Sequence, residues 1–116
     1  MKDFLIAELK KLAEKQKGTL TDEEYQQELE LIEAIDWPIK DRVQEVHLGS
    51  VARLEMNGRA QWYFVSPIGG GNFITSSLGP LLVVSAFSGL GQELLGKKIG
   101  ETFQVQSISF KLLELH

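Results

Sequence analysis

The spacing of the apolar residues changes once along this chain, and that change constrains the fold more than any other feature. Near the start, Leu5, Leu9 and Leu12 recur at intervals of four and three residues, which predicts an amphipathic helix. Beyond about residue 46 the apolar residues instead alternate or form short runs, which predicts strands. A chain of 116 residues suits one domain, or one domain with a small appendage. The two patterns together predict the α+β class.

A second helix is expected directly after the first. Gly18 can take the left-handed position that ends a helix, and Thr21 with Glu24 three residues on has the pattern of a capping box. A proline then disfavours helical geometry, so the second helix should stop near Asp36. Two helices of about 14 residues, joined by a tight turn, predict an antiparallel hairpin over residues 1–37. The pattern leaves open whether this hairpin packs on the rest of the chain or projects from it.

The rest of the chain predicts a mostly antiparallel sheet with one short helix. Residues 38–45 are expected to connect the hairpin to a globular domain of residues 46–116. Asn57-Gly58 is typical of a type I′ hairpin turn, and Ser88 can cap a short helix that Gly96 closes. We expect strands at 46–48, 51–54, 61–65, 81–85 (buried on both faces), 102–106 and 109–115, the short helix at 89–95, and a loop at 69–77.

Composition narrows the possible functions. The chain has no cysteine, which excludes a disulfide scaffold, a thiolate zinc site and a cysteine nucleophile. Residues 1–45 hold 12 acids and 7 bases, whereas residues 46–116 hold 4 acids and 5 bases, which together give the net charge of -4. Neither part has the dense basic patch that offsets phosphate charge, so direct, sequence-specific nucleic-acid binding is not expected. The acidic part is either a solvated helix face or a surface that meets a cation or a basic groove.

The chain also shows no pattern for export or membrane insertion. Its first residues lack the basic and then apolar sequence of a signal peptide. The longest apolar run, at 81–86 with Ser85 inside it, is too short to span a membrane. We therefore expect a cytoplasmic protein with no membrane role.

Two stretches with ordered glycines resemble a known family. The first is VHLGSVARL at 46–54, and the second, more specific one is VSAFSGLGQELLGKKIGE at 84–101. FKLLEL at 110–115 matches the last strand in character. These residues resemble the C-terminal domain of the Gre family of bacterial transcription elongation factors. The resemblance covers the globular part well and the hairpin only in kind.

The resemblance implies an FKBP-like fold for the globular part and RNA polymerase as the partner. Members of the family place this domain at the rim of the polymerase secondary channel and insert the helical hairpin through it. Acidic residues at the hairpin tip then help to hold a catalytic magnesium ion, for which carboxylate oxygens are suitable hard ligands. The matching tip acids here are Asp22, Glu23 and Glu24. Helix capping and the helix dipole also account for acids at this position.

Docking in the family involves an acidic residue followed by Ser-Pro just before the short helix. The matching positions here are Phe87, Ser88 and Gly89, so the serine is kept, the acid is replaced by an aromatic residue and the proline by glycine. A phenylalanine at this place fits either an exposed docking patch or the core.

The length of the hairpin separates a regulatory role from a catalytic one. A helix of about 14 residues spans about 21 Å, and the family arms that reach the polymerase active centre are roughly twice as long. We therefore expect a non-enzymatic accessory factor that binds RNA polymerase near the secondary channel and modulates elongation without stimulating transcript cleavage. In this respect the chain resembles a short-armed member of the superfamily, the regulator of nucleoside diphosphate kinase.

Two other functional classes stay open. An FKBP-like fold suggests prolyl isomerase activity, but alternation places Tyr63 on the opposite face from Trp62 and Phe64, which disfavours a single aromatic pocket. The main alternative is a self-associating binding module, homodimeric through the apolar stripe of the hairpin. We expect no cofactor and no metal site, because the two histidines, His47 and His116, have no clustered ligands.

Overall fold

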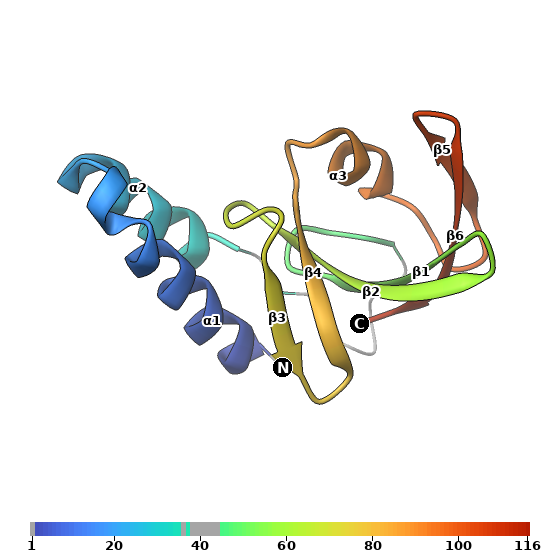
Figure 1. Cartoon of the computed structure of the whole chain (residues 1–116), viewed down its shortest axis with the longest axis horizontal. Coiled ribbons are helices and arrows are strands. Elements are labelled where there is room, and N and C mark those ends of the chain that lie inside the picture. The colour runs from blue at the N-terminus through green and yellow to red at the C-terminus, as the bar shows by residue number, and fades with distance from the viewer. Residues whose placement is uncertain (1, 36, 38–44) are drawn as a thin grey trace.

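The computed structural model describes residues 2–35, 37 and 45–116 of the chain. A helical hairpin lies beside a six-stranded sheet, and a third, short helix lies on the other side of the sheet (Figure 1). The elements are α1 (Lys2–Lys15), η1 (Lys17–Thr19), α2 (Asp22–Glu33), β1 (Val51–Met56), β2 (Arg59–Ser66), β3 (Phe73–Ser76), β4 (Gly79–Ser85), α3 (Gly89–Leu94), β5 (Thr102–Val105) and β6 (Ile108–Leu115). The predicted α+β class is confirmed. None of the helices in these described segments is long and apolar enough to cross a membrane.

The predicted hairpin is present, but its turn is built differently from the prediction. Gly18 lies in the 3-10 turn η1 and does not have a positive φ, so the expected left-handed helix end at this residue is wrong. The Gln16 N–H instead donates to the carbonyls of Leu12 and Ala13, each at 3.2 Å, and the Thr19 N–H donates to the Gln16 carbonyl at 2.9 Å. The backbone carbonyls at the end of α1 therefore receive hydrogen bonds from a tightened last turn, and this arrangement needs no glycine.

The start of α2 has the predicted capping box. The Thr21 hydroxyl accepts a hydrogen bond from the Glu24 N–H at 3.1 Å, and the Glu24 carboxylate accepts one from the Thr21 N–H at 3.1 Å. The helix ends at Glu33, with Ala34 as its C-cap, and so has 12 residues. Asp36, where the helix was expected to stop, lies outside the described residues, as do residues 38–44 of the expected connector.

The sheet has the strand order β3-β4-β2-β1-β6-β5. Neighbouring strands are antiparallel except for β2 and β4, which run parallel with Trp62 opposite Leu81. The predicted turn between β1 and β2 is confirmed, because Asn57 and Gly58 have φ values of 53° and 78°. Strand β4 is covered on both faces, also as predicted, since alternate residues belong to different core clusters.

Two strand predictions are wrong. Residues 69–77 do not form one loop, because β3 lies within them and pairs with β4 around a tight turn. Conversely, Val46 and Leu48 are not in a strand. Leu48 and Gly49 form a turn in which Gly49 has a φ of 93°, and this turn separates Val46 from β1. Val46 is buried, and its N–H donates to the Lys97 carbonyl at 2.9 Å.

The hairpin packs on its own sheet. Its buried residues share one core cluster with residues on a single face of β1, β2, β3 and β4: Leu5, Leu9, Ala13, Ile32 and Ile35 with Val51, Phe64, Ile74, Leu81 and Val83, together with Ile68 of the loop after β2. A β-carbon at Gly69, in the same loop, would lie 2.8 Å from Leu12 Cδ1, so α1 also lies against this loop. Trp37 stacks on Phe64 with ring centroids 5.9 Å apart.

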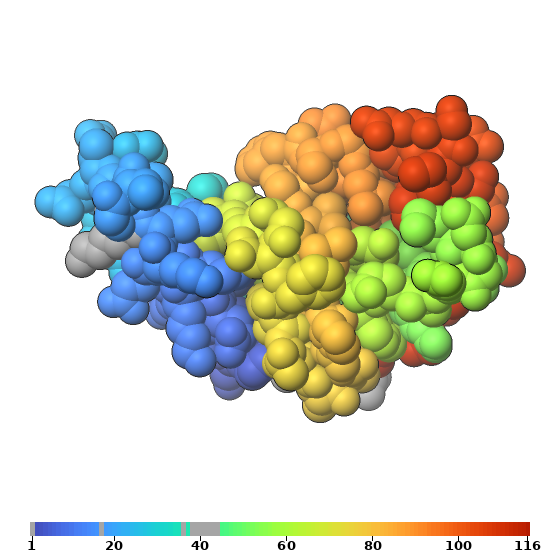
Figure 2. Space-filling view, viewed as in Figure 1, coloured from blue at the N-terminus to red at the C-terminus, as the bar shows by residue number. Residues whose placement is uncertain are grey.

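The opposite face of the sheet forms a second core with α3. Leu94 of α3 is fully buried there with Tyr63, Val65 and Leu112. Trp62 and Phe64 pack on the hairpin side, so the three consecutive aromatic residues of β2 are divided between the faces as predicted. Between the hairpin and α3 the surface is hollowed, with the segment that joins β2 to β3 at its base (Figure 2).

Candidate protein-docking site

The hairpin tip presents the predicted acidic residues to solvent. Asp22, Glu23 and Glu24 are all exposed in the first turn of α2. Glu24 is part of the capping box, so its carboxylate has a structural role. Burial, and then the negative charge of Glu24, raises the pKa of Glu28 one turn further along. Among the described residues, no group of three or more histidine or carboxylate side chains is arranged to hold a metal ion.

The residues at the predicted docking position form a rigid turn between β4 and α3. The Ser85 carbonyl accepts hydrogen bonds from the Ser88 N–H at 3.1 Å and from the Ser88 hydroxyl at 2.7 Å. The Ser85 hydroxyl accepts one from the Phe87 N–H at 3.2 Å. Ser88 is the N-cap of α3, because its hydroxyl also accepts from the Gly91 N–H at 3.0 Å. The backbone around Phe87 is thus fixed on both sides.

This turn holds Phe87 in solvent. Its side chain is 71% exposed, the largest exposed fraction among the large apolar side chains that the structure describes as exposed. The alternative that Phe87 belongs to the core is therefore wrong. Gly89 is exposed, and a β-carbon there would meet nothing closer than Val105 Cγ1 at 4.0 Å. Packing therefore does not require glycine at this position. Because Gly89 has no side chain, no side chain from this position covers Phe87.

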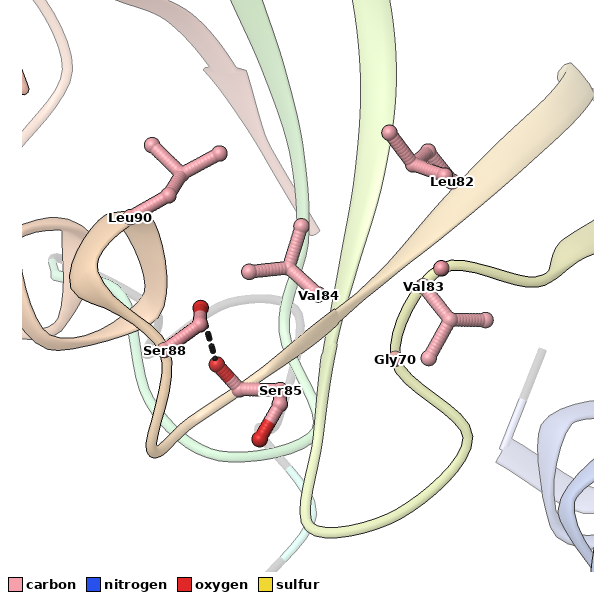
Figure 3. A pocket seen from close by; sticks show the side chains of 8 residues that line it. Gly70, Leu82, Val83, Val84, Ser85, Ser88 and Leu90 are labelled. Atoms are coloured by element: carbon pink, nitrogen blue, oxygen red, sulfur yellow. Dashed lines mark hydrogen bonds between the residues drawn. The ribbon is translucent and has the colours of Figure 1, made fainter.

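A cleft that the sequence did not reveal lies next to this turn (Figure 3). It has a volume of about 390 Å³ and is open to solvent. Its lining comes from the loop before β3, from the end of β4 and from the start of α3: Gly70, Gly71, Leu82, Val83, Val84, Ser85, Ser88 and Leu90. Leu82, Val84 and Leu90 lie on one side of β4, and Val83 points to the other side, toward the hairpin (Figure 3).

The glycines of the loop let it pass close to β4 at one side of the cleft. A β-carbon at Gly70 would lie 3.1 Å from Ser85 Cβ and 3.2 Å from the Ser85 nitrogen, so the loop approaches β4 more closely than most residues allow. Gly71 donates its N–H to the Val83 carbonyl at 2.9 Å and has a φ of 90°.

The sequence offered one signal for such a surface. Within residues 66–96 Glu93 is the single charged residue, although the stretch is only partly buried.

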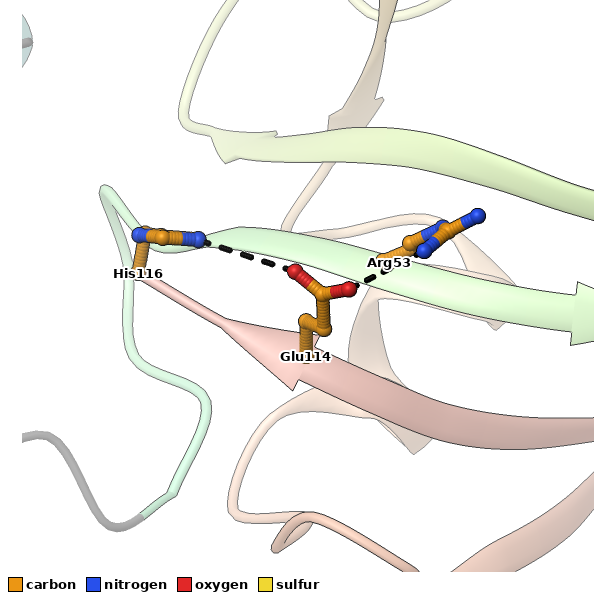
Figure 4. A network of polar contacts seen from close by, with 3 residues as sticks. All are labelled: Arg53, Glu114 and His116. Carbon is orange, nitrogen blue, oxygen red and sulfur yellow. Dashed lines mark hydrogen bonds and ion pairs between the residues drawn. The ribbon is translucent and has the colours of Figure 1, made fainter. Parts of the chain in front are cut away.

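The two histidines do not form a site. His116 Nε2 lies 4.0 Å from a Glu114 oxygen, and the other Glu114 oxygen accepts a hydrogen bond from Arg53 at 3.0 Å (Figure 4). The His116 ring also lies against Trp62, with ring centroids 5.5 Å apart. These side chains are between a third and a half exposed, so they form a surface ion-pair network of small energetic weight. His47 is exposed and belongs to a different part of the chain.

The apolar stripe that would join two hairpins is not available on the surface. Leu5, Leu9 and Ile32 are at most 1% exposed, because the sheet of the same chain already covers them. Dimerisation through this stripe would require the hairpin to leave its own sheet. The structure therefore contradicts the prediction that two copies of the chain pair through the apolar stripe of the hairpin.

Comparison with known proteins shows the fold of the chain. No protein-family model matches it, and no curated protein matches it significantly. Three solved structures are similar over 99% of this chain. They are the GreA factor homolog 1 (Gfh1) protein of Thermus thermophilus (22% identity, 87% of that chain covered, TM-score 0.48), Gfh1 of Thermus aquaticus (21%, 86%, 0.46) and a further structure of the transcription factor Gfh1 (18%, 86%, 0.50). The last of these shows that the chain has a Gre-like fold, and identity this low shows the fold alone.

Proposed function

We propose that this protein is a cytoplasmic accessory factor that binds RNA polymerase near the secondary channel and modulates elongation without stimulating transcript cleavage. The Gre-like fold, which is also that of a protein described as the transcription factor Gfh1, supports the class of function. The observation on which the proposal depends most is the short hairpin buried against its own sheet.

The hairpin lacks the reach that a catalytic role would need. Helices of 14 and 12 residues span about 21 and 18 Å at about 1.5 Å per residue. Part of this length lies against the body of the protein, because Leu12 meets the loop at Gly69. From Leu12 to the tip at Thr19 the hairpin extends only about 10 Å. Acids carried on so short a projection are unsuited to completing a metal site deep inside a partner.

The turn at Phe87 supports binding to a protein partner. Phe87 is 71% exposed, and a capped helix and three hydrogen bonds to Ser85 fix the backbone around it, so this backbone loses little conformational freedom when Phe87 is buried in an interface. Large aromatic side chains in such positions often dominate binding energy. Phe87, Ser88 and Gly89 are therefore the proposed docking residues, in the place where the Gre family carries its acidic residue and Ser-Pro.

A binding measurement with purified core RNA polymerase tests the proposal. We expect immobilised protein to bind the polymerase at micromolar concentration or below, and Phe87→Ala to weaken binding by at least about tenfold. Leu31→Ala is the matched control, because Leu31 is 42% exposed on α2, away from the docking turn, and should not change the affinity. A folded wild-type protein that does not bind, or equal losses in both variants, would refute polymerase docking through this turn.

A cleavage assay on stalled elongation complexes tests the second part of the proposal. We expect no stimulation of RNA cleavage by the wild-type protein at concentrations that saturate binding. Robust cleavage that is lost in Asp22→Ala would show that the tip acids do reach the catalytic metal. Sedimentation of the same preparation then distinguishes a monomeric factor from the alternative, a self-associating module with no polymerase role.

A further inference from the structure

A projecting aromatic side chain and an apolar cleft lie next to each other beside α3. Phe87 is 71% exposed and directly precedes Ser88, which lines the cleft together with Leu82 and Leu90 (Figure 3). Phe87 does not fill this cleft itself, since it is not one of the lining residues and most of its surface meets solvent. Phe73 is 64% exposed and lies opposite Leu82 in the β3–β4 pair, so these two side chains share a face of the sheet. So much exposed aromatic surface around an apolar cleft indicates a contact surface.

The cleft has the size and the lining to accept a phenyl ring. Its volume of about 390 Å³ exceeds that of any single side chain, and Leu82, Val84 and Leu90 are each at least partly buried around it. Gly70 and Gly71 line the same cleft without side chains, so the backbone of a second molecule can approach closely. A ring that enters the cleft therefore leaves water without burying a charged group of the lining.

The scarcity of charge on this surface allows contact between two identical copies. Residues 66–96, which contain Phe73, the cleft and Phe87, hold a single charged residue, Glu93. Two identical surfaces of one charge repel each other, whereas two nearly uncharged apolar surfaces do not. A second copy also supplies the aromatic ring that the cleft can accept, in Phe87. The chain is therefore complementary to itself on this face.

We infer that two copies of the chain pair through this face, with Phe87 of each copy inserted into the cleft of the other. Because the ring and the cleft are adjacent, a two-fold axis between them forms both contacts at once and closes the assembly at a dimer. The hydrogen bonds of Ser85 and Ser88 already fix the backbone around Phe87 before pairing. The contact is small, so we expect a Kd of roughly 0.1–1 mM. At micromolar concentration the chain is then a monomer.

Pairing of this kind buries the residue that is also proposed to dock on RNA polymerase. A chain whose Phe87 lies in the cleft of a second copy cannot place the same ring on the polymerase, so the two contacts compete. Binding to the polymerase at micromolar concentration is the stronger contact and draws the chain out of the dimer. This competition rests on the proposed function, whereas the dimer itself does not.

Dilution of the full chain tests the pairing. Between about 2 mM and about 20 µM we expect the amide NMR signals of Gly70, Gly71 and Leu90 to shift, and sedimentation to approach the mass of a dimer at the upper end. Salt should not weaken the pairing, because it screens the repulsion between two chains of net charge -4. Phe87→Ala should weaken it at least about tenfold, and Leu31→Ala, at a 42% exposed position of α2, should leave it unchanged. Shifts that do not depend on concentration, equal pairing by Phe87→Ala, or assemblies larger than a dimer would overturn the inference.

A mixture of two defective variants separates this pairing from general stickiness. Phe87→Ala keeps the cleft and loses the ring, whereas Leu82→Gln keeps the ring and makes the cleft polar. Neither variant should pair with itself, but a mixture restores one of the two contacts. Isotope-labelled Phe87→Ala should therefore show shifts at Gly70 and Gly71 when unlabelled Leu82→Gln is added, and labelled Leu82→Gln should show none there when the partners are exchanged. If Leu82→Gln does not fold, unlabelled wild-type protein supplies the ring instead.

The mixing experiment and the polymerase measurement fail independently. A labelled Phe87→Ala protein that shows no shift at the cleft with either ring donor refutes the insertion of Phe87, whatever the polymerase does. If the wild-type chain pairs as expected and core polymerase does not bind, the proposed function fails while this inference stands.

Discussion

Truncation of Leu9 to alanine would show whether the hairpin is an integral part of the fold. Leu9 is fully buried in the cluster that joins α1 to Phe64 and Leu81 of the sheet. Leucine-to-alanine changes at such sites cost about 2–5 kcal/mol, because transfer free energy is lost and a cavity remains. For 116 residues the entropy of unfolding is about 0.24 kcal/mol/K, so each kcal/mol lowers Tm by about 4 °C. A loss of about 3 kcal/mol therefore predicts a Tm about 12 °C lower.

The decisive readout is whether helix and sheet unfold together. Far-UV circular dichroism follows the helices, and near-UV dichroism follows Trp62 on β2 and Trp37 stacked on Phe64. In the Leu9→Ala variant we expect both signals to shift by the same amount. Leu31→Ala, at a 42% exposed position of α2, should change stability by less than about 0.5 kcal/mol. A Leu9→Ala protein that loses helix signal first while the aromatic signal keeps its wild-type Tm would refute the shared core.

Four further substitutions test local features. Gly91→Ala should destabilise the protein by about 2 kcal/mol in denaturant titration, because the new β-carbon would collide with the Ser85 carbonyl oxygen. Gly89→Ala has open space around it and should be neutral or slightly stabilising. Thr21→Ala should cost about 1 kcal/mol by removing the capping box, and an unchanged midpoint would contradict its role. Burial, and then a neighbouring carboxylate, raises the pKa of Glu28, so its contribution to stability is present at acid pH and lost as pH rises through the folded pKa. Glu28→Gln should therefore raise the free energy of unfolding at neutral pH by less than about 1 kcal/mol. It should also make that free energy fall less steeply as the pH rises above the ordinary pKa of a carboxyl group. Thermal melts at a series of pH values measure both effects.

The features that the sequence predicted well depend on contacts between residues close in the chain. The capping box at Thr21 and the cap at Ser88 each involve a hydroxyl and a backbone N–H three residues on. The Asn57-Gly58 turn follows from the positive φ that these two residues tolerate. Local chemistry of this kind needs no knowledge of the tertiary structure, so a single sequence was enough.

The features that the sequence did not predict depend on contacts between residues that are distant in the chain. Strand β3 follows a run of glycines and is stabilised by pairing with β4, so its local pattern resembled a loop. Val46 has the apolar character of a strand residue, yet it is buried beside Lys97, far along the chain. The cleft was invisible for the same reason, because the residues that line it come from three separate elements. No spacing rule brings Gly70 next to Ser85.

Burial of the hairpin changes what its acids can do. With the apolar stripe covered by the sheet, the remaining surface of α2 is mainly carboxylate. A carboxylate acts as a metal ligand only within direct contact, but its field acts over a Debye length of roughly 8 Å at physiological salt. The tip extends only about 10 Å beyond Leu12, so its acids are expected to act through their electric field and not as ligands of a metal ion deep inside a partner. The six acids of α2 thus form a charged surface, whereas the cleft next to the Phe87 turn is lined only by uncharged residues.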